Sequence, residues 1–391
     1  MDKPKIRFQG FEEAWCEKTL GEIAECNYGG GTPSTINKDY WSSCGLPWIQ
    51  SSDLIQDDVL NVVPRKFITA KALKNTATKF IPSNSLAIVT RVGVGKLALI
   101  PFDYATSQDF TSLSKLKTDK YFSAFSIYTL LLKDLNLVQG TSIKGITKDE
   151  ILQKDIFIPS LPEQEKIGKL FERIDHLLNL QQRKCDKLND IKKSMLTKMF
   201  PKPGKRVPEV RFEGFTDDWV ECKISDLFKI TRGNVLAETK TNSKASKINP
   251  YPVYSSQTKK NGLLGYYSNY LYEDAITWTT DGANAGTVKF RPGKFYCTNV
   301  CGVLLTKTVE ANPMIAEALN MVAKRHVSYV GNPKLMNNVM ADISLKIPLS
   351  QKERTINSNF FHKLDTLIRL NELKLSKLRL LKRSFLKGMF V

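Results

Sequence analysis

The sequence has few of the residues and motifs on which most enzymes depend. Its three histidines are too few and too scattered for a metal centre or a catalytic triad. No Gly-x-x-x-x-Gly-Lys-Ser/Thr loop occurs, since residues 93–97 are too short a match and lack the hydroxyl. Asn249-Pro250-Tyr251 lacks the second proline that DNA amino-methyltransferases need, and no acidic cluster of nuclease type is evident. Together these absences favour binding over catalysis.

Long hydrophobic runs and closely paired cysteines are also missing. No stretch reaches the roughly 18 uncharged apolar residues of a membrane span, and the first eight residues have no apolar run behind their charges. The seven cysteines are odd in number, and no two have the two-residue gap of a zinc site or a redox couple. We therefore expect a cytoplasmic protein with reduced thiols, no membrane contact and no metal.

Positive charge is present in excess. Lysine and arginine total 58 against 39 acidic residues, a formal net charge of +19. Residues 163–206 contain 12 bases and 6 acids, and residues 352–387 contain 10 bases and 3 acids. This excess suits a polyanion, because each neutralised phosphate releases a counterion. Charge alone leaves open a basic surface without a nucleic-acid partner.

The chain contains one plan twice. The motif Arg-Phe-x-Gly-Phe-x-x-x-Trp occupies residues 7–15 and, 204 positions later, residues 211–219. Each half ends in a long helical pattern, which is entered through Glu165 in the first half and Glu353 in the second. From Phe171 and Phe361 onward, the two helical segments align without a gap at an offset of 190. The plan is therefore a variable unit and a helix, each repeated once.

Both helical segments carry a heptad pattern, with apolar residues at alternating spacings of four and three. Some 35 residues at about 1.5 Å each would form a rod on the order of 50 Å long. We expect the segments to pair as an antiparallel coiled coil; the alternative is two unrelated amphipathic helices, each on its own domain. Polar residues interrupt the two patterns at matching places, Gln181 and Lys192 in the first and Asn371 and Lys382 in the second.

The variable units have mixed α and β patterns. Apolar runs predict strands at 86–89 and 301–305, and helical patterns cover 121–132 and 313–323. The predicted class is α+β, with two mixed α/β domains joined by two long helices. The predicted boundaries are 1–160 for the first domain, 161–200 for its helix, 201–207 for a linker, 208–349 for the second domain and 350–391 for its helix.

These motifs together resemble the specificity subunit of a type I restriction–modification system. The resemblance covers essentially the whole chain and includes the duplicated opening, Gly-Gly-Thr-Pro-Ser at 30–34 with Pro-Trp-Ile at 47–49, and Pro-x-x-Pro-Glu-Gln from Pro159. Both helices end in Leu-x-x-Met-Phe. The second half departs at 348–353, where a proline and a glutamate would be expected, and has Thr-Arg-Gly-Asn at 231–234 in place of Gly-Gly-Thr-Pro-Ser.

The resemblance implies a non-catalytic target-recognition subunit. Each domain would read one half of a bipartite site in double-stranded DNA, and the helices would set the gap between the half-sites. Two methyltransferase subunits and the restriction/translocase subunits would be its partners; S-adenosylmethionine and ATP would belong to those partners, so the chain would have no cofactor. The alternatives are a stand-alone sequence-specific DNA-binding protein and an undetected nuclease or methyltransferase, which would be active in isolation.

Candidate DNA-binding residues lie in polar loops beside the predicted strands. Arg91 opens a glycine-rich loop, where its guanidinium could contact a guanine edge, a phosphate or a surface carboxylate. Lys144 and Lys334 occupy matching places before the helices, which favours a shared phosphate role, while Asn284 could equally serve its own turn. The full set is Ser34, Ser51, Ser52, Arg91, Lys96 and Lys144 in the first domain and Arg232, Asn234, Gln257, Asn284 and Lys334 in the second.

Overall fold

The computed structural model describes residues 3–137, 145–256 and 259–391. It contains two compact units: unit 1 is Met1–Arg183 with Leu373–Val391, and unit 2 is Lys184–Glu372. Each unit combines a mixed α/β head with stretches of both long helices. The predicted α+β class is thereby confirmed, while the predicted domain boundaries, which separate heads from helices, stay a prediction.

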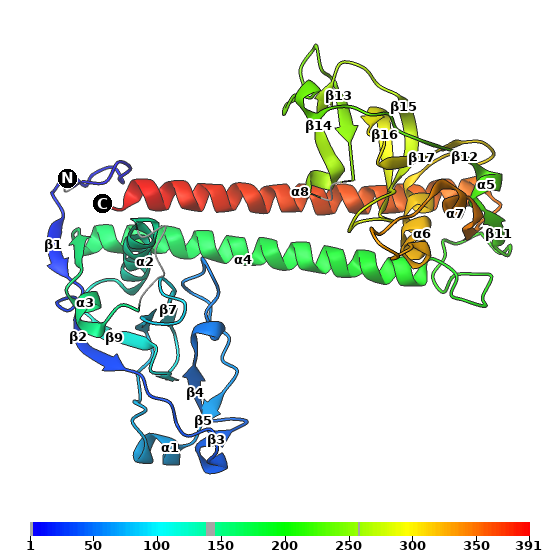
Figure 1. Ribbon diagram of the computed structural model, residues 1–391. Helices are drawn as coiled ribbons and strands as arrows, with labels where there is room; N and C mark the ends of the chain where they lie inside the picture. The colour runs from blue at the N-terminus through cyan, green and yellow to red at the C-terminus, as the bar shows by residue number, and fades with distance from the viewer. Residues whose placement is uncertain (1–2, 138–144, 257–258) are drawn as a thin grey trace. The chain divides into compact units, whose positions relative to one another are not determined.

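Head 1, residues 16–158, is built on an antiparallel sheet of order β2-β9-β6-β7 (Figure 1). Leu86 and Ile88 of β6 pack in one core with helix α2, whereas Ala87 and Val89 pack in another with Ile49 of a second sheet, of order β3-β5-β4-β8. Burial on both faces makes β6 a continuous apolar run, so the predicted strand at 86–89 is confirmed. The elements of head 1 are β1 (Cys16–Thr19), β2 (Ala24–Gly29), β3 (Trp41–Ser42), β4 (Leu46–Ile49), β5 (Phe67–Ile68), α1 (Ala70–Asn75), β6 (Ser85–Val89), β7 (Leu97–Ile100), β8 (Ala105–Thr106), β9 (Phe110–Leu116), α2 (Lys120–Leu137), α3 (Lys148–Leu152) and β10 (Asp155–Ile158).

Head 2, residues 220–347, contains a six-stranded sheet of order β12-β17-β15-β16-β13-β14. Its first four strands repeat the order of the central sheet of head 1, although the two stretches align poorly in sequence. Helix α6 begins at Pro313, where the Asn312 side chain accepts a hydrogen bond from the Ile315 N–H, and the predicted helix is confirmed. The elements of head 2 are β11 (Val220–Lys223), α5 (Ile224–Leu227), β12 (Phe228–Arg232), β13 (Tyr251–Tyr254), β14 (Leu263–Tyr267), β15 (Tyr272–Thr279), β16 (Val288–Cys297), β17 (Cys301–Thr306), α6 (Pro313–Ala323), α7 (Asn337–Asp342) and β18 (Ser344–Ile347).

A short two-stranded sheet closes the base of each head, β1 with β10 and β11 with β18. Beside it, Arg7 donates from Nε and Nη2 to the two carboxylate oxygens of Glu163, at 2.7 and 2.8 Å. Arg211 binds Glu353 in the same bidentate way, at 2.8 Å for both bonds. The duplicated opening motif thus holds the start of each long helix.

These contacts correct one part of the sequence alignment. The counterpart of Glu353 is Glu163 and not Glu165, because both Glu163 and Glu353 accept the arginine of an opening motif. The second half therefore does have the expected glutamate. It lies one residue further beyond the Ile-Pro pair because that connection is one residue longer.

The long helices are α4 (Leu161–Lys198) and α8 (Gln351–Met389), and within each unit they run antiparallel. In unit 1, Lys382 on α8 pairs with Asp175 on α4, and Arg379 on α8 bonds Gln182 on α4. In unit 2, Lys192 on α4 pairs with Asp365 on α8 at 2.7 Å. The predicted antiparallel coiled coil is confirmed. No helix in the described parts of the chain is long and apolar enough to span a membrane.

The Met-Phe motif at the end of each long helix lies in a hydrophobic core. In unit 1, the Phe390 ring lies 5.7 Å from that of Phe122 and 5.4 Å from that of Phe171. In unit 2, the Phe200 ring lies 6.0 Å from that of Trp219 and 5.7 Å from that of Phe361. Because aromatic pairs contribute beyond the area that they bury, each motif anchors a helix end in a head.

Candidate nucleic-acid interface

In head 1, several strand ends meet at one edge. Strands β2 and β6 are both antiparallel to β9, so their C-terminal ends lie beside its N-terminal end. The Thr90 N–H donates to Asp109 O at 2.7 Å, and the Ser107 N–H donates to Ile49 O at 3.0 Å, which brings the end of β4 to the same place. Loops 30–34, 50–54, 90–96 and 106–109 converge here, and we call this the loop edge of head 1.

Four of the candidate residues gather at this edge. The Lys96 ammonium donates to the carbonyls of Ser51 and Leu54, both at 3.4 Å, so Lys96 braces the loop that carries Ser51 and Ser52. Arg91 is exposed and lines, with residues 92–94 and Gly145, a hollow of about 600 Å³. The Ile146 N–H donates to Thr90 O at 2.7 Å, which places the segment after Lys144 beside Arg91. Lys144 itself lies outside the described residues.

Head 2 has the corresponding edge, formed by residues 233–235, 280–287, 298–300 and 328–335. The Thr280 N–H donates to Val300 O at 3.1 Å and the Leu335 N–H to Thr280 O at 2.8 Å. The Lys334 ammonium lies 3.8 Å from an Asp281 carboxylate oxygen. In both heads, therefore, the loop after the second strand of the central sheet (β6 in head 1, β15 in head 2) meets the segment before the last short helix (α3 in head 1, α7 in head 2).

A glycine at the end of β2 and of β12 permits a close approach in both heads. A Cβ on Gly30 would lie 1.8 Å from Ser107 O, and one on Gly233 would lie 2.2 Å from Cys297 O. The Gly30 N–H donates to Phe110 O and the Gly233 N–H to Cys301 O, in each case the first residue of the neighbouring strand. Thus head 2 lacks the Gly-Gly-Thr-Pro-Ser sequence but keeps one glycine of it for the same packing reason.

The other candidates lie at these edges with different surroundings. Ser34 is exposed, and its carbonyl accepts the Trp41 indole N–H at 3.0 Å. Arg232 and Asn234 are exposed at the end of β12. The half-buried Asn284 lies in a turn where its backbone carbonyl accepts the Thr287 N–H, and a role for its side chain stays a prediction. Gln257 lies outside the described residues, and contact of any candidate with DNA stays a prediction.

Sequence reasoning missed residues beside both edges. Arg65 donates to Ser52 O at 3.2 Å and pairs with Asp53 at 3.5 Å, while its side chain stays 65% exposed. Val92 is strongly exposed at the tip of the Arg91 loop, and Val330 is 92% exposed next to Tyr329 at the tip of the Lys334 segment. The dipeptide Arg65-Lys66 after an apolar pair was an available signal; the exposure of the valines was not, because valine usually indicates a strand.

A buried arginine lies in the sheet of head 2 against Tyr254, whose carbonyl accepts the Thr298 N–H of the edge. The Arg291 guanidinium lies 3.7 Å from the centroid of the Tyr254 ring and donates to Thr277 Oγ1 at 3.1 Å. Burial lowers the pKa of Arg291 and raises the pKa of the nearby Cys301 thiol to about 11. Protonated thiols are poor metal ligands, and no group of three or more His, Cys, Asp or Glu in the described parts could hold a metal ion.

Each edge therefore presents exposed cations, short polar side chains and apolar tips on loops that a sheet supports. Guanidinium and amide groups can recognise base edges, ammonium groups can bind phosphates, and a methyl group can contact thymine. These are the kinds of group that nucleic-acid-binding loops present.

Comparison with known proteins finds relatives that cover most of the chain. The family model "Type I restriction modification DNA specificity domain" matches residues 12–190 and 216–380. A Mycoplasma pneumoniae protein named as a putative type I specificity subunit, S.MpnORF289P N-terminus, is 40% identical over 146 residues, which are 35% of this chain and 75% of that protein. The MjaIX specificity subunit of Methanocaldococcus jannaschii is 24% identical over 89% of this chain and 86% of its own length.

Coverage and solved structures complete the comparison. The chain spans only 34% of another M. pneumoniae relative and 44% of the EcoR124I/EcoR124II specificity subunit of Escherichia coli. The crystal structure of a type I restriction–modification S subunit from M. genitalium matches 100% of this chain and 99% of its own, with a TM-score of 0.74 and 15% identity. A chain from a study of assembly and conformational transition of the type I system matches 96% of this chain and 97% of its own, with a TM-score of 0.52 and 15% identity.

Proposed function

We propose that this chain, which belongs to the type I restriction–modification DNA specificity family, reads a bipartite DNA target through its two heads, one half-site each. Membership of the family supports recognition of DNA sequence within a restriction–modification system. The division into two half-sites is our proposal, and the observation that carries it is the duplicated loop edge. A common strand order supports two loop sets of different sequence, as two readers of two different half-sites require.

The helices would bind partner subunits. Leu177 and Leu180 on α4 are about half exposed in unit 1, and their counterparts at an offset of 190, Leu367 and Leu370 on α8, are about half exposed in unit 2. Repeated exposed leucines on a long helix are typical of a protein-binding surface. Because the surface occurs once in each unit, two copies of one partner would bind, which suits two methyltransferase subunits.

The chemistry would take place on these partners. We expect S-adenosylmethionine to bind the methyltransferase subunits and ATP to bind the restriction/translocase subunits. The chain itself would supply recognition and assembly, without a cofactor and without catalysis. Its basic helices would add phosphate contacts that depend on salt but not on sequence.

The test is methylation mapping in cells that express this chain with and without a candidate methyltransferase subunit. We expect a bipartite motif with a fixed gap only when both are present. Replacing residues 1–150 by another first head should change one half-site and leave the other half-site unchanged. Methylation by this chain alone would overturn its non-catalytic role, and tight specific binding without any partner would favour a stand-alone DNA-binding protein.

A further inference from the structure

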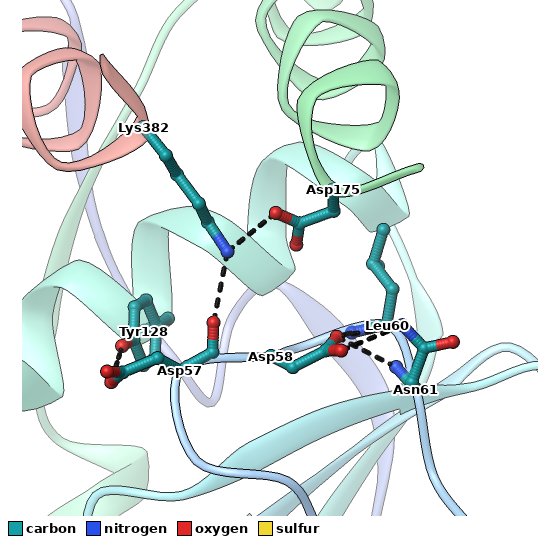
Figure 2. Close-up of polar contacts among 7 residues, drawn as sticks. All are labelled: Asp57, Asp58, Leu60, Asn61, Tyr128, Asp175 and Lys382. Carbon is teal, nitrogen blue, oxygen red and sulfur yellow. Dashed lines mark hydrogen bonds and ion pairs between the residues drawn. The ribbon is translucent and has the colours of Figure 1, made fainter. Parts of the chain in front are cut away.

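A buried lysine on α8 contacts both α4 and head 1 in unit 1. The Lys382 ammonium lies 2.6 Å from Asp175 Oδ1 on α4 and donates to the carbonyl of Asp57 in head 1 at 3.1 Å (Figure 2). The Lys382 side chain is 8% exposed and that of Asp175 is 3% exposed. One ammonium thus joins three segments of the unit: both helices and a loop of the head.

The loop that Lys382 contacts is itself held in place. The Tyr128 hydroxyl on α2 donates to Asp57 Oδ1 at 2.6 Å, and Asp58 Oδ1 accepts the N–H groups of Leu60 and Asn61, each at 3.1 Å (Figure 2). Asp57 has a φ of 62°, a left-handed backbone that is uncommon for residues other than glycine. Because these bonds hold the loop, the Asp57 carbonyl points in a defined direction, toward the Lys382 ammonium.

This loop leads directly to the loop edge of head 1. Only two residues separate Asp57 from Leu54, and the carbonyls of Leu54 and Ser51 accept hydrogen bonds from the Lys96 ammonium. A change in where α8 holds Asp57 would therefore move the segment that carries Ser51 and Ser52.

The arrangement is repeated in unit 2 with the helices exchanged. The Lys192 ammonium on α4 lies 2.7 Å from Asp365 on α8 and 2.6 Å from Glu317 on α6 of head 2. At the offset of 190, Lys192 matches Lys382 and Asp365 matches Asp175. The helix-to-helix pair is thus duplicated, whereas the contact with the head differs: a backbone carbonyl in head 1 and a carboxylate in head 2.

A lysine in a heptad seam lowers the stability of a coiled coil relative to an apolar residue. Replacing a buried ion pair by apolar side chains is often neutral or stabilising, and polar seam residues are best known for fixing register. An apolar seam residue would allow a head to shift on its helices, since dispersion contacts have no direction. An ammonium with fixed acceptors allows one position only.

We propose that Lys382 and Lys192 are positioning residues that fix the orientation of each head on its own stretch of the helix pair. The proposal rests on the proposed function. Its consequence is that the complex accepts only one gap length between the two half-sites. Loss of these contacts should relax the gap requirement while the half-site sequences stay the same.

The experiment uses the full chain assembled with its methyltransferase subunits and synthetic duplexes carrying the mapped motif. The gap is left unchanged, shortened by one base pair or lengthened by one. The test variant is Lys382→Met with Asp175→Leu, which removes both charges together. The control is Lys387→Met, an exposed lysine on the same helix. The measured quantity is the ratio of methylation rates on the correct and altered gaps.

We expect the ratio to fall about tenfold in the double variant, the size of one mismatched base pair, and to stay unchanged in the control. An unchanged ratio in a folded double variant would overturn the proposal and leave the pair a structural one. If that variant does not fold, the same ratio is measured for Lys382→Arg, which keeps the charge but changes the length and shape of the side chain. A lower ratio would then support the proposal, and an unchanged ratio would overturn it. A wild-type complex that methylates no bipartite motif would instead count against the proposed function.

Discussion

Removing either arginine of the duplicated opening motif should destabilise the chain, and the two losses should differ. Arg7→Ala leaves the Glu163 carboxylate, 1% exposed, without its bidentate partner. Breaking a buried ion pair from one side costs about 3–5 kcal/mol. The 14% exposure of the Arg7 side chain would let water reach the site. We therefore expect a loss near the lower limit, about 3 kcal/mol.

The matched change in unit 2 should cost less. Glu353 also accepts the Trp219 indole N–H at 3.2 Å, a bond that would survive Arg211→Ala. The equivalent Trp15 indole nitrogen is buried and has no hydrogen-bond partner among the described residues. A hydrogen bond to a charged group contributes about 1.5–3 kcal/mol. Arg211→Ala also loses the exposed hydrogen bond from Nη2 to the Asp217 carbonyl at 2.8 Å, which reduces the difference. We therefore expect Arg211→Ala to cost about 1 kcal/mol less than Arg7→Ala.

Urea denaturation of both variants gives the free energy of unfolding, and hydrogen exchange at the starts of α4 and α8 locates the loss. Lysine at either position keeps the charge but loses the bidentate geometry, and we expect it to recover only part of the stability. Equal losses from the two alanine variants, or a larger loss from Arg211→Ala, would refute the role given to the tryptophan bond.

Three further predictions concern burial, packing and recognition. Burial raises the pKa of Asp175 to about 6, against the opposing effect of Lys382. As the pH falls through 6, the folded protein takes up this proton before the unfolded chain does, so protonation stabilises the folded state. Between pH 7 and 4.5 the free energy of unfolding of wild type, measured by urea titration, should therefore rise by about 2 kcal/mol relative to that of Asp175→Asn. Parallel pH profiles would contradict this. Gly233→Ala should cost about 1–3 kcal/mol by thermal unfolding, because its Cβ would meet the rigid carbonyl of Cys297; an unchanged melting temperature would count against that contact. Arg91→Ala should weaken DNA binding by about 1–3 kcal/mol at one position of one half-site if Arg91 contacts a base, whereas uniform weakening with a shallower salt dependence would indicate a phosphate contact.

Local patterns in the sequence predicted the elements that depend on local physics. The heptads predicted α4 and α8 because packing along a seam repeats every few residues. The helix at 313–323 has both an asparagine cap and a proline at its first position, two signals on adjacent residues. The strand at 86–89 is apolar throughout because both of its faces are covered. Such signals can be recognised in the sequence without knowledge of the fold.

Contacts between distant segments were not predictable in this way. The Arg7–Glu163 pair spans 156 positions, and an alignment that starts from the two Ile-Pro pairs matches Glu353 with Gln164, because the second connection is one residue longer. The equivalence of Gly30 and Gly233 depends on strand register, which no local pattern encodes. For the candidate site, the sequence indicated the loops that converge in each head. The partners of its lysines follow only from the fold: Lys96 binds the Ser51 carbonyl, and Lys334 lies near the Asp281 carboxylate.

The placement of Phe390 has a consequence for the order of events during synthesis. The residues that receive it, Phe122 and Phe171, are translated long before Phe390 itself, since Phe390 follows Phe171 by 219 positions. At roughly 5–20 residues per second, that interval lasts on the order of 10–40 s. During this time the core of unit 1 is incomplete, whereas unit 2 consists of a single continuous segment, residues 184–372. A nascent chain should therefore complete its second unit before its first, and a chaperone that binds exposed aromatic surface should find its target on the half that left the ribosome earliest.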